Sequence, residues 1–167
     1  MQVRAAMGDI TTMQVDAIVN AANERLQRGG GVCGAIFRAA GPRLDEACDA
    51  IGRCQTGDAV ATPGFDLPAR WIIHAVGPVW KGGRSGEAEQ LASFYRRVIE
   101  VADEVDARSV AIPAISTGIY GYPSDQAAAL VTETLAGVMS PTVEEVVLVA
   151  FDQETARRYE RLIGHGS

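Results

Sequence analysis

The chain has 167 residues, of which 47% are hydrophobic and 22% are charged, a size and composition that suit one globular domain over residues 1–167. The 21 acidic residues outnumber the 15 basic ones, so the net charge of −6 disfavours general binding to nucleic acid or acidic membranes. No apolar run approaches the roughly 20 residues of a membrane span. Three cysteines and two histidines without zinc-like spacing predict no metal site. We therefore expect a cytoplasmic protein with reduced thiols.

Six short segments rich in apolar and β-branched residues have the composition of buried strands. They are, in chain order, residues 3–7, 15–19, 59–62, 71–76, 109–113 and 145–151. Helical patterns separate them, and the clearest covers Glu87–Val105, where apolar residues recur at steps of three and four. Further helices are expected to begin near Cys33, after Pro123 and after Asp152. Strands that alternate with helices predict a largely parallel sheet covered on both faces, which is a three-layer α/β/α fold.

The first glycine-rich segment, residues 20–34, connects a predicted strand to a predicted helix. Its triple glycine allows positive φ angles and the close approach of a ligand, and the free N–H groups of the following helix favour an anion. Gly29, Gly31 and Gly34 also satisfy the GxGxxG pattern of dinucleotide-binding folds, but nine residues separate that pattern from Val19, the last strand residue. We therefore favour a phosphate site over a Rossmann site. A flexible turn before a helix is the remaining alternative.

A second glycine-rich loop, residues 115–123, follows the fifth predicted strand. The N–H groups of Ser116, Thr117 and Gly118 can form a concavity for an anion, and Tyr120 offers an aromatic wall and a hydroxyl. The alternative is a tight strand-to-helix connection around a packed tyrosine. Because both loops are expected at the carboxyl edge of the sheet, together they favour a clamp for a diphosphate. Neither loop holds the lysine of a P-loop, which argues against nucleoside-triphosphate transfer.

Five motifs follow one another along nearly the whole chain. They are residues 8–11 (GDIT), 16–23 (DAIVNAAN), 29–31 (GGG), 73–80 (IHAVGPVW) and 112–118 (IPAISTG). In this order they resemble the macrodomain family, most of all its MacroD-type ADP-ribosyl hydrolase branch. The resemblance implies a three-layer α/β/α fold around a central six-stranded mixed sheet, with a cleft for ADP-ribose across the crest of the sheet. ADP-ribose is the implied ligand, and no cofactor or metal is implied.

The resemblance also assigns roles around ADP-ribose. Asp9 would accept a hydrogen bond from the adenine amino group, and the Ile10 N–H would donate to the ring. Asn23 would contact the terminal ribose and place the attacking water, while Tyr120 would shape the pocket for that ribose. Phe151 is expected either to pack against the adenine or to belong to the core.

The two glycine-rich loops would hold the diphosphate. The other ligand-binding residues that the resemblance implies are Asn20, Ala22, Gly30, Gly31, Val32, Gly34, Ser116, Thr117, Gly118 and Ile119. Of these, Asn20 is expected to brace its loop. Two further polar residues are interpreted as structural, because His74 lies in the middle of an apolar strand and Asp152 is placed to cap the last helix.

The chain departs from the MacroD-type pattern in the first loop, where Cys33 and Phe37 replace the usual aspartate and histidine. That aspartate positions or activates the attacking water, and general-base help is typically worth about 10²–10⁴-fold, so a slower enzyme is expected. Substrate assistance remains available, because a water held by Asn23 can pass its proton to an α-phosphate oxygen. Cys33 is either a nucleophile activated by a helix N-terminus or a small residue that lets the loop close. Since no histidine lies near it in the sequence, we favour the second interpretation.

These residues predict a metal-independent hydrolase that removes ADP-ribose from proteins mono-ADP-ribosylated on Asp or Glu and that also accepts O-acetyl-ADP-ribose. The alternative is a non-catalytic ADP-ribose reader, which the loss of the aspartate favours and the retention of Asn23 and Tyr120 opposes. ADP-ribosylated nucleic-acid ends form a third substrate class, which the acidic net charge does not favour. The expected partners are ADP-ribose and mono-ADP-ribosylated proteins, bound by a monomer. The scarcity of lysine beside abundant alanine, arginine and glycine suggests a bacterial source.

Overall fold

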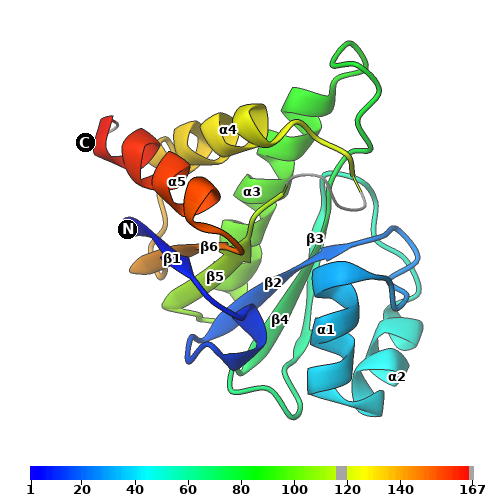
Figure 1. The fold of residues 1–167 in the computed structure, drawn as a ribbon. Coiled ribbons are helices and arrows are strands. Elements are labelled where there is room, and N and C mark those ends of the chain that lie inside the picture. Colours follow the sequence, from blue (N-terminus) through cyan, green and yellow to red (C-terminus); the bar gives the residue numbers. More distant parts are fainter. Residues whose placement is uncertain (116–119, 166–167) are drawn as a thin grey trace.

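The computed structural model describes residues 1–115 and 120–165 and has a six-stranded sheet at its centre (Figure 1). The strands are β1 (Gln2–Met7), β2 (Ala17–Ala22), β3 (Ala59–Pro63), β4 (Trp71–Val76), β5 (Ser109–Pro113) and β6 (Glu145–Ala150). Their order across the sheet is β1-β6-β5-β2-β4-β3. β3 pairs with β4 antiparallel, and the other neighbours pair parallel, which confirms the predicted mixed sheet.

Helices cover both faces of this sheet (Figure 1). They are η1 (Ile10–Thr12), α1 (Gly31–Ala40), α2 (Pro42–Ile51), α3 (Glu87–Glu104), α4 (Ser124–Ala136) and α5 (Gln153–His165). One hydrophobic cluster joins α3, α4 and α5 to the sheet, and a second joins α1 and α2 to its other face. Adjacent residues of β2 serve opposite faces, since Val19 belongs to the first cluster and Ile18 to the second. The predicted three-layer α/β/α fold is confirmed.

The helix α2 has no counterpart among the predicted elements. It buries only Leu44 and Cys48, so its apolar periodicity is too weak to stand out in the sequence. The Gly41–Pro42 pair was the available signal: Gly41 turns the chain with a φ of 91°, and Pro42 opens the helix where a missing N–H breaks no helical bond. Within the described residues, no helix is long and apolar enough to cross a membrane.

The first glycine-rich loop begins later than the sequence predicts. β2 extends to Ala22, which pairs with Val76 of β4, because the strand is covered on both faces. Asn20 therefore lies inside the strand and does not belong to the loop. Of the three consecutive glycines, Gly31 alone has a positive φ, 56°, and it is the first residue of α1.

Candidate functional site

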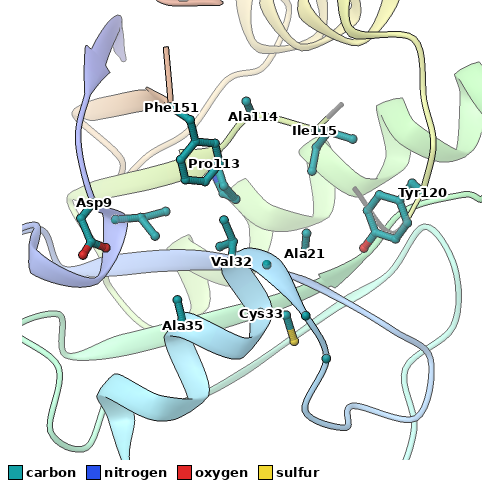
Figure 2. Close-up of a pocket in the computed structure, with 14 residues that line it drawn as sticks. Asp9, Ala21, Val32, Cys33, Ala35, Pro113, Ala114, Ile115, Tyr120 and Phe151 are labelled. Carbon is teal, nitrogen blue, oxygen red and sulfur yellow. The ribbon is translucent and has the colours of Figure 1, made fainter. Parts of the chain in front are cut away.

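A cavity of about 620 Å³ lies at the carboxyl ends of β1, β2, β5 and β6, beside the N-terminus of α1 (Figure 2). Parallel strands end at the same edge of a sheet, so loops far apart in the sequence meet there. The volume falls in the range of small-molecule sites, about 300–1,000 Å³. Among the described residues the cavity is lined by Asp9, Ile10, Ala21, Gly29, Gly30, Gly31, Val32, Cys33, Ala35, Pro113, Ala114, Ile115, Tyr120 and Phe151.

One end of the cavity, which we call the Phe151 end, is formed by Asp9, Ile10 and Phe151. Asp9 Oδ1 accepts hydrogen bonds from the hydroxyl and the N–H of Thr11, at 2.7 and 2.9 Å. These bonds orient the carboxylate and hold the pKa of Asp9 below its usual value. The Phe151 side chain is 63% exposed while it lines the cavity, which excludes the predicted alternative of a core position.

The first turn of α1 forms the middle of the cavity. Gly30, its N-cap, has no side-chain oxygen to cap the helix, and a Cβ at Gly30 or Gly31 would meet nothing within 4 Å. N–H groups in a first turn lack intrahelical partners and favour an anion. Gly34 serves packing, because a Cβ there would lie 2.6 Å from the Gly29 carbonyl oxygen. Of the predicted phosphate-binding residues of this loop, Gly30, Gly31 and Val32 thus line the cavity, and Gly34 lets the helix approach the loop before it.

The opposite end, which we call the Tyr120 end, is lined by two of the three predicted catalytic residues, Cys33 and Tyr120. The third, Asn23, is not among the lining residues and meets Cys33 at the Gln27 carbonyl. Asn23 Nδ2 donates to the Gln27 carbonyl at 2.9 Å, and Asn23 Oδ1 accepts from the Gln27 N–H at 3.1 Å. The Cys33 thiol donates weakly to the same carbonyl, at 3.8 Å. Two of the three residues therefore meet on one backbone oxygen. The Asn23 amide keeps one hydrogen and one lone pair for a further partner.

Tyr120 forms a wall of this end and is not an acid. Its buried hydroxyl donates to the Ala22 carbonyl at 2.6 Å and lies 3.2 Å from the Ala75 carbonyl. Burial raises the pKa of Tyr120 well above its usual value, so the hydroxyl keeps its proton. Gly77 packs against the ring, since a Cβ there would lie 2.7 Å from Tyr120 Cε2. The position of the ring is thus set at both its hydroxyl and its edge.

Several predicted ligand-binding residues do not line the cavity. Ser116, Thr117, Gly118 and Ile119 lie outside the described residues. Ala22 contributes its carbonyl to Tyr120, and Asn20 is buried below the site. The sequence missed a set of small or apolar lining residues whose only signal is their place at strand ends and around α1. They are Ala21, Ala35, Pro113 and Ala114, whereas Gly29 and Ile115 belong to the two loops that the sequence predicted.

A buried polar cluster lies in the sheet below the cavity. Asn20 Nδ2 lies 3.0 Å from His74 Nδ1, and Thr62 Oγ1 lies 3.0 Å from His74 Nε2. Because Thr62 donates its hydroxyl to the Pro63 carbonyl at 3.2 Å, His74 Nε2 carries the proton and Nδ1 accepts from Asn20. Burial lowers the pKa of His74 to about 4, so the ring is neutral at pH 7. The predicted structural role of His74 is confirmed, and Asn20 braces β2 against β4.

The remaining polar residues of interest have structural partners. Asp152 Oδ1 accepts from the Thr155 N–H at 2.7 Å, which confirms the predicted cap of α5. His74 contacts the Cys48 thiol at 3.9 Å, and its two ring nitrogens are partnered by Asn20 and Thr62, so neither is left to form a dyad with Cys33. Burial raises the pKa of Cys48 to about 12 and that of Cys54 to about 11. In the described part of the chain no three His, Cys, Asp or Glu side chains are grouped to hold a metal.

Comparisons with known proteins found relatives that cover nearly the whole chain. The sequence model of the family described as "Macro domain" matches residues 19–131. A protein of Salmonella newport named O-acetyl-ADP-ribose deacetylase is 51% identical over 168 residues, covering 97% of this chain and 94% of its own. A solved macrodomain of Oceanobacillus iheyensis with ADP is 38% identical with a TM-score of 0.90, covering 96% of this chain and 89% of its own. A Trypanosoma brucei macrodomain in complex with ADP-ribose is 35% identical with a TM-score of 0.88, covering 98% and 69%.

Proposed function

Since this chain belongs to the macro domain family, we propose that its cavity binds ADP-ribose and that it releases ADP-ribose from acceptors by hydrolysis. The observation that carries the proposal is the order of groups along the cavity. An exposed aromatic ring and an oriented carboxylate lie at one end, an uncapped helix N-terminus in the middle, and a hydrogen-bonded polar cluster at the other. A base, a diphosphate and a second ribose follow one another in ADP-ribose in the same order.

Each part of the ligand has a matching group. Phe151 offers a face for the adenine, and Asp9 offers an acceptor for its amino group. The first turn of α1 offers N–H donors and the positive end of the helix dipole to the diphosphate, which suits a chain with one lysine and a net negative charge. The Tyr120 end is left for the terminal ribose and its acceptor group.

The proposed reaction is the attack of water on an ester of the terminal ribose. Asn23, held rigidly by Gln27, orients the water with its remaining hydrogen-bonding positions. The water oxygen bonds to the ester carbon and gives its proton to an α-phosphate oxygen of the substrate. The bond between that carbon and the ribose oxygen then breaks, and the ribose oxygen takes the proton back from the phosphate, so that ADP-ribose and a carboxylic acid leave. Tyr120 shapes the site, since its own proton is bonded to Ala22.

Two ester classes fit this chemistry: O-acetyl-ADP-ribose, and proteins mono-ADP-ribosylated on Asp or Glu. The first is supported by the name of the Salmonella relative. The second differs only in the acyl group beyond the scissile bond. We propose that the protein acts on both in the bacterial cytoplasm as a monomer.

The rival proposal, a reader that binds ADP-ribose without turnover, is favoured by one observation. Cys33 stands at the Tyr120 end with its thiol bonded to a backbone carbonyl, and it supplies no carboxylate to activate water. We rank the reader second because two hydrogen bonds to Gln27 fix the Asn23 side chain more firmly than ligand binding alone would require.

The deciding experiment measures turnover and binding on the same protein. Release of ADP-ribose is followed from O-acetyl-ADP-ribose and from a protein mono-ADP-ribosylated on Glu or Asp, while calorimetry measures ADP-ribose binding. Binding with release supports the hydrolase, and binding without release from either substrate would make the protein a reader. Absence of binding would overturn both proposals.

A further inference from the structure

A buried carboxylate holds together the exposed loop that follows β4. Glu87, the first residue of α3, is 1% exposed. Its Oε2 accepts from the N–H groups of Lys81 and Gly83, at 3.0 and 2.8 Å, and its Oε1 accepts from the Ser85 N–H at 2.6 Å. Residues 81–86 are themselves exposed, so this carboxylate, and not an apolar core, organises their backbone.

The surroundings of the Glu87 carboxylate favour its ionised form. The backbone N–H groups, that of Lys81 most of all, lower the pKa of Glu87 to about 2. Glu87 is therefore ionised throughout the physiological pH range. The dipole of α3 does not require the Glu87 charge, because the exposed Glu89 also places a carboxylate in the first turn. The Glu87 carboxylate instead serves the N–H donors of the loop.

The loop leads from Glu87 to the ligand cavity through Trp80. Gly83 packs on this ring so closely that a Cβ there would lie 2.8 Å from Trp80 Cη2. The Trp80 N–H donates to the Tyr120 carbonyl at 2.7 Å, and its ring contacts Tyr122 with 4.7 Å between centroids. Tyr120 lies across the cavity from Asp9 (Figure 2). The three hydrogen bonds of Glu87 thus fix a loop that packs on Trp80, and Trp80 in turn contacts the backbone of Tyr120 and the ring of Tyr122.

From these contacts we propose that Glu87 is a positioning residue that sets the Tyr120 wall through the 81–85 loop and Trp80. Glu87 touches no ligand. The inference rests on the proposed function, because it concerns how the cavity holds the second ribose of ADP-ribose. ADP carries the base and the diphosphate but lacks that ribose, so it probes the Phe151 end and the α1 turn alone. The ratio of the affinities for ADP-ribose and ADP therefore reports on the Tyr120 wall.

The first test replaces the carboxylate by an amide of the same shape. In Glu87→Gln at least one of the three N–H groups faces an NH₂ donor and loses its acceptor. We expect ADP-ribose to bind about 10-fold more weakly, the equivalent of one lost hydrogen bond, and ADP to change less than about 2-fold. The matched control is Glu89→Gln, which removes the same charge from an exposed residue of the same helix turn and should leave both affinities unchanged.

A pair of glycine variants tests the same path without removing any charge. Gly83→Ala and Gly82→Ala both place a side chain at a positive φ, 89° and 95°, so their backbone strain is alike. The new Cβ meets Trp80 at position 83, whereas at position 82 it meets nothing within 4 Å. Gly83→Ala should therefore lower the ratio of affinities, and Gly82→Ala should not. This pair keeps the test valid if Glu87→Gln folds poorly.

A spectroscopic readout follows the intermediate step. The chain has two tryptophans, and Trp71→Phe leaves Trp80 as the only one. In that background Glu87→Gln and Gly83→Ala should increase acrylamide quenching of Trp80, and their controls should not. Equal weakening of ADP-ribose and ADP, or an unchanged ratio in both variants, would overturn the inference. If the wild type binds neither ligand, the proposed function fails first and the inference falls with it.

Discussion

The two ends of the cavity are built in opposite ways. The Phe151 end lies in the segments directly after β1 and β6. Its Asp9 is exposed and Phe151 is 63% exposed, whereas Ile10 is buried. At the Tyr120 end, the tyrosine is 4% and Cys33 6% exposed, and both bond to backbone carbonyls. The difference separates two tasks within the proposed function. An exposed end can recognise a base, whereas only a rigid end can hold a water against an ester.

Asn23→Ala is expected to have the largest effect, because it removes the group that orients the water. We expect kcat to fall roughly 100-fold or more, the usual penalty for a misplaced reactant, while ADP-ribose binding changes only a few-fold. The measurement is single-turnover release of ADP-ribose with calorimetry alongside. Gln27→Ala is the matched control, since Gln27 holds Asn23 through its backbone only. A normal rate in Asn23→Ala would remove Asn23 from the mechanism.

Acid should destabilise the protein through His74, which is buried in the sheet. The pKa of His74 is about 4 in the folded protein and near 6.5 in the unfolded chain. Between these values the unfolded state binds a proton that the folded state excludes. Stability is therefore complete above pH 6.5 and falls as the pH drops towards 4, by up to about 3 kcal/mol.

Urea unfolding at pH 7.5 and 4.5 measures this effect. Carboxylates also titrate in this range, so the informative quantity is the difference between the wild type and His74→Gln, which should lack about 3 kcal/mol of the pH dependence. His165→Gln, which changes the other histidine of the chain, should behave as the wild type. The same pH dependence in His74→Gln and the wild type would show that the buried cluster does not titrate as described.

Phe151→Ala tests the exposed end. Stacking of a base on an aromatic ring is worth roughly 1–3 kcal/mol, so the Kd for ADP-ribose should rise about 10-fold. Because the ring is exposed, the free energy of unfolding should hardly change, and kcat at saturating substrate should be kept. Met139→Ala, at a residue 93% exposed and outside the cavity lining, is the control. A fall in kcat with unchanged Kd would reverse the assignment of the two ends.

Cys33→Asp should have the smallest effect, and in the opposite direction. It returns a carboxylate to the Tyr120 end, where a general base is typically worth about 10²–10⁴-fold. The site is nearly closed to solvent and faces the Gln27 carbonyl, so part of that gain is lost to burying the charge, and we expect kcat to rise only about 3- to 10-fold. Cys33→Ser, which keeps the size and the donor, should give no gain. A slower Cys33→Asp enzyme would mean that the thiol itself is needed.

The sequence predicted the layers of the fold because its strands are strongly apolar and its long helix is strongly periodic. β6 and α3 are examples, and their predicted bounds differ from the observed ones by one residue. It missed α2, whose two buried residues give little periodicity. It ended the second strand before Asn20, because an asparagine in a strand interior is explained only by its partner His74 on β4.

Asp9 and Phe151, whose roles the family resemblance implied, line the cavity, and so do Gly30 and Gly31, which were predicted from the backbone freedom of the triple glycine. Two features depend on contacts between distant segments and could not be read locally. One is the meeting of Asn23 and Cys33 on the Gln27 carbonyl, and the other is the bond from Tyr120 to Ala22. The role of Glu87 is of the same kind, since as a sequence feature it is one more acidic residue at a helix start.

The pairing of β1 with β6 has a consequence for how the protein is made. β1 joins β6 along its whole length, from Gln2 opposite Glu145 to Met7 opposite Ala150, so β1 must wait for β6, which is made much later. Such distant pairings are slow to form. A nascent chain that ends before residue 145 can form the glycine turn of α1 but has neither a partner for β1 nor the Phe151 ring. Capture of ligand by the aromatic end thus requires that β6 and Phe151 have already been made.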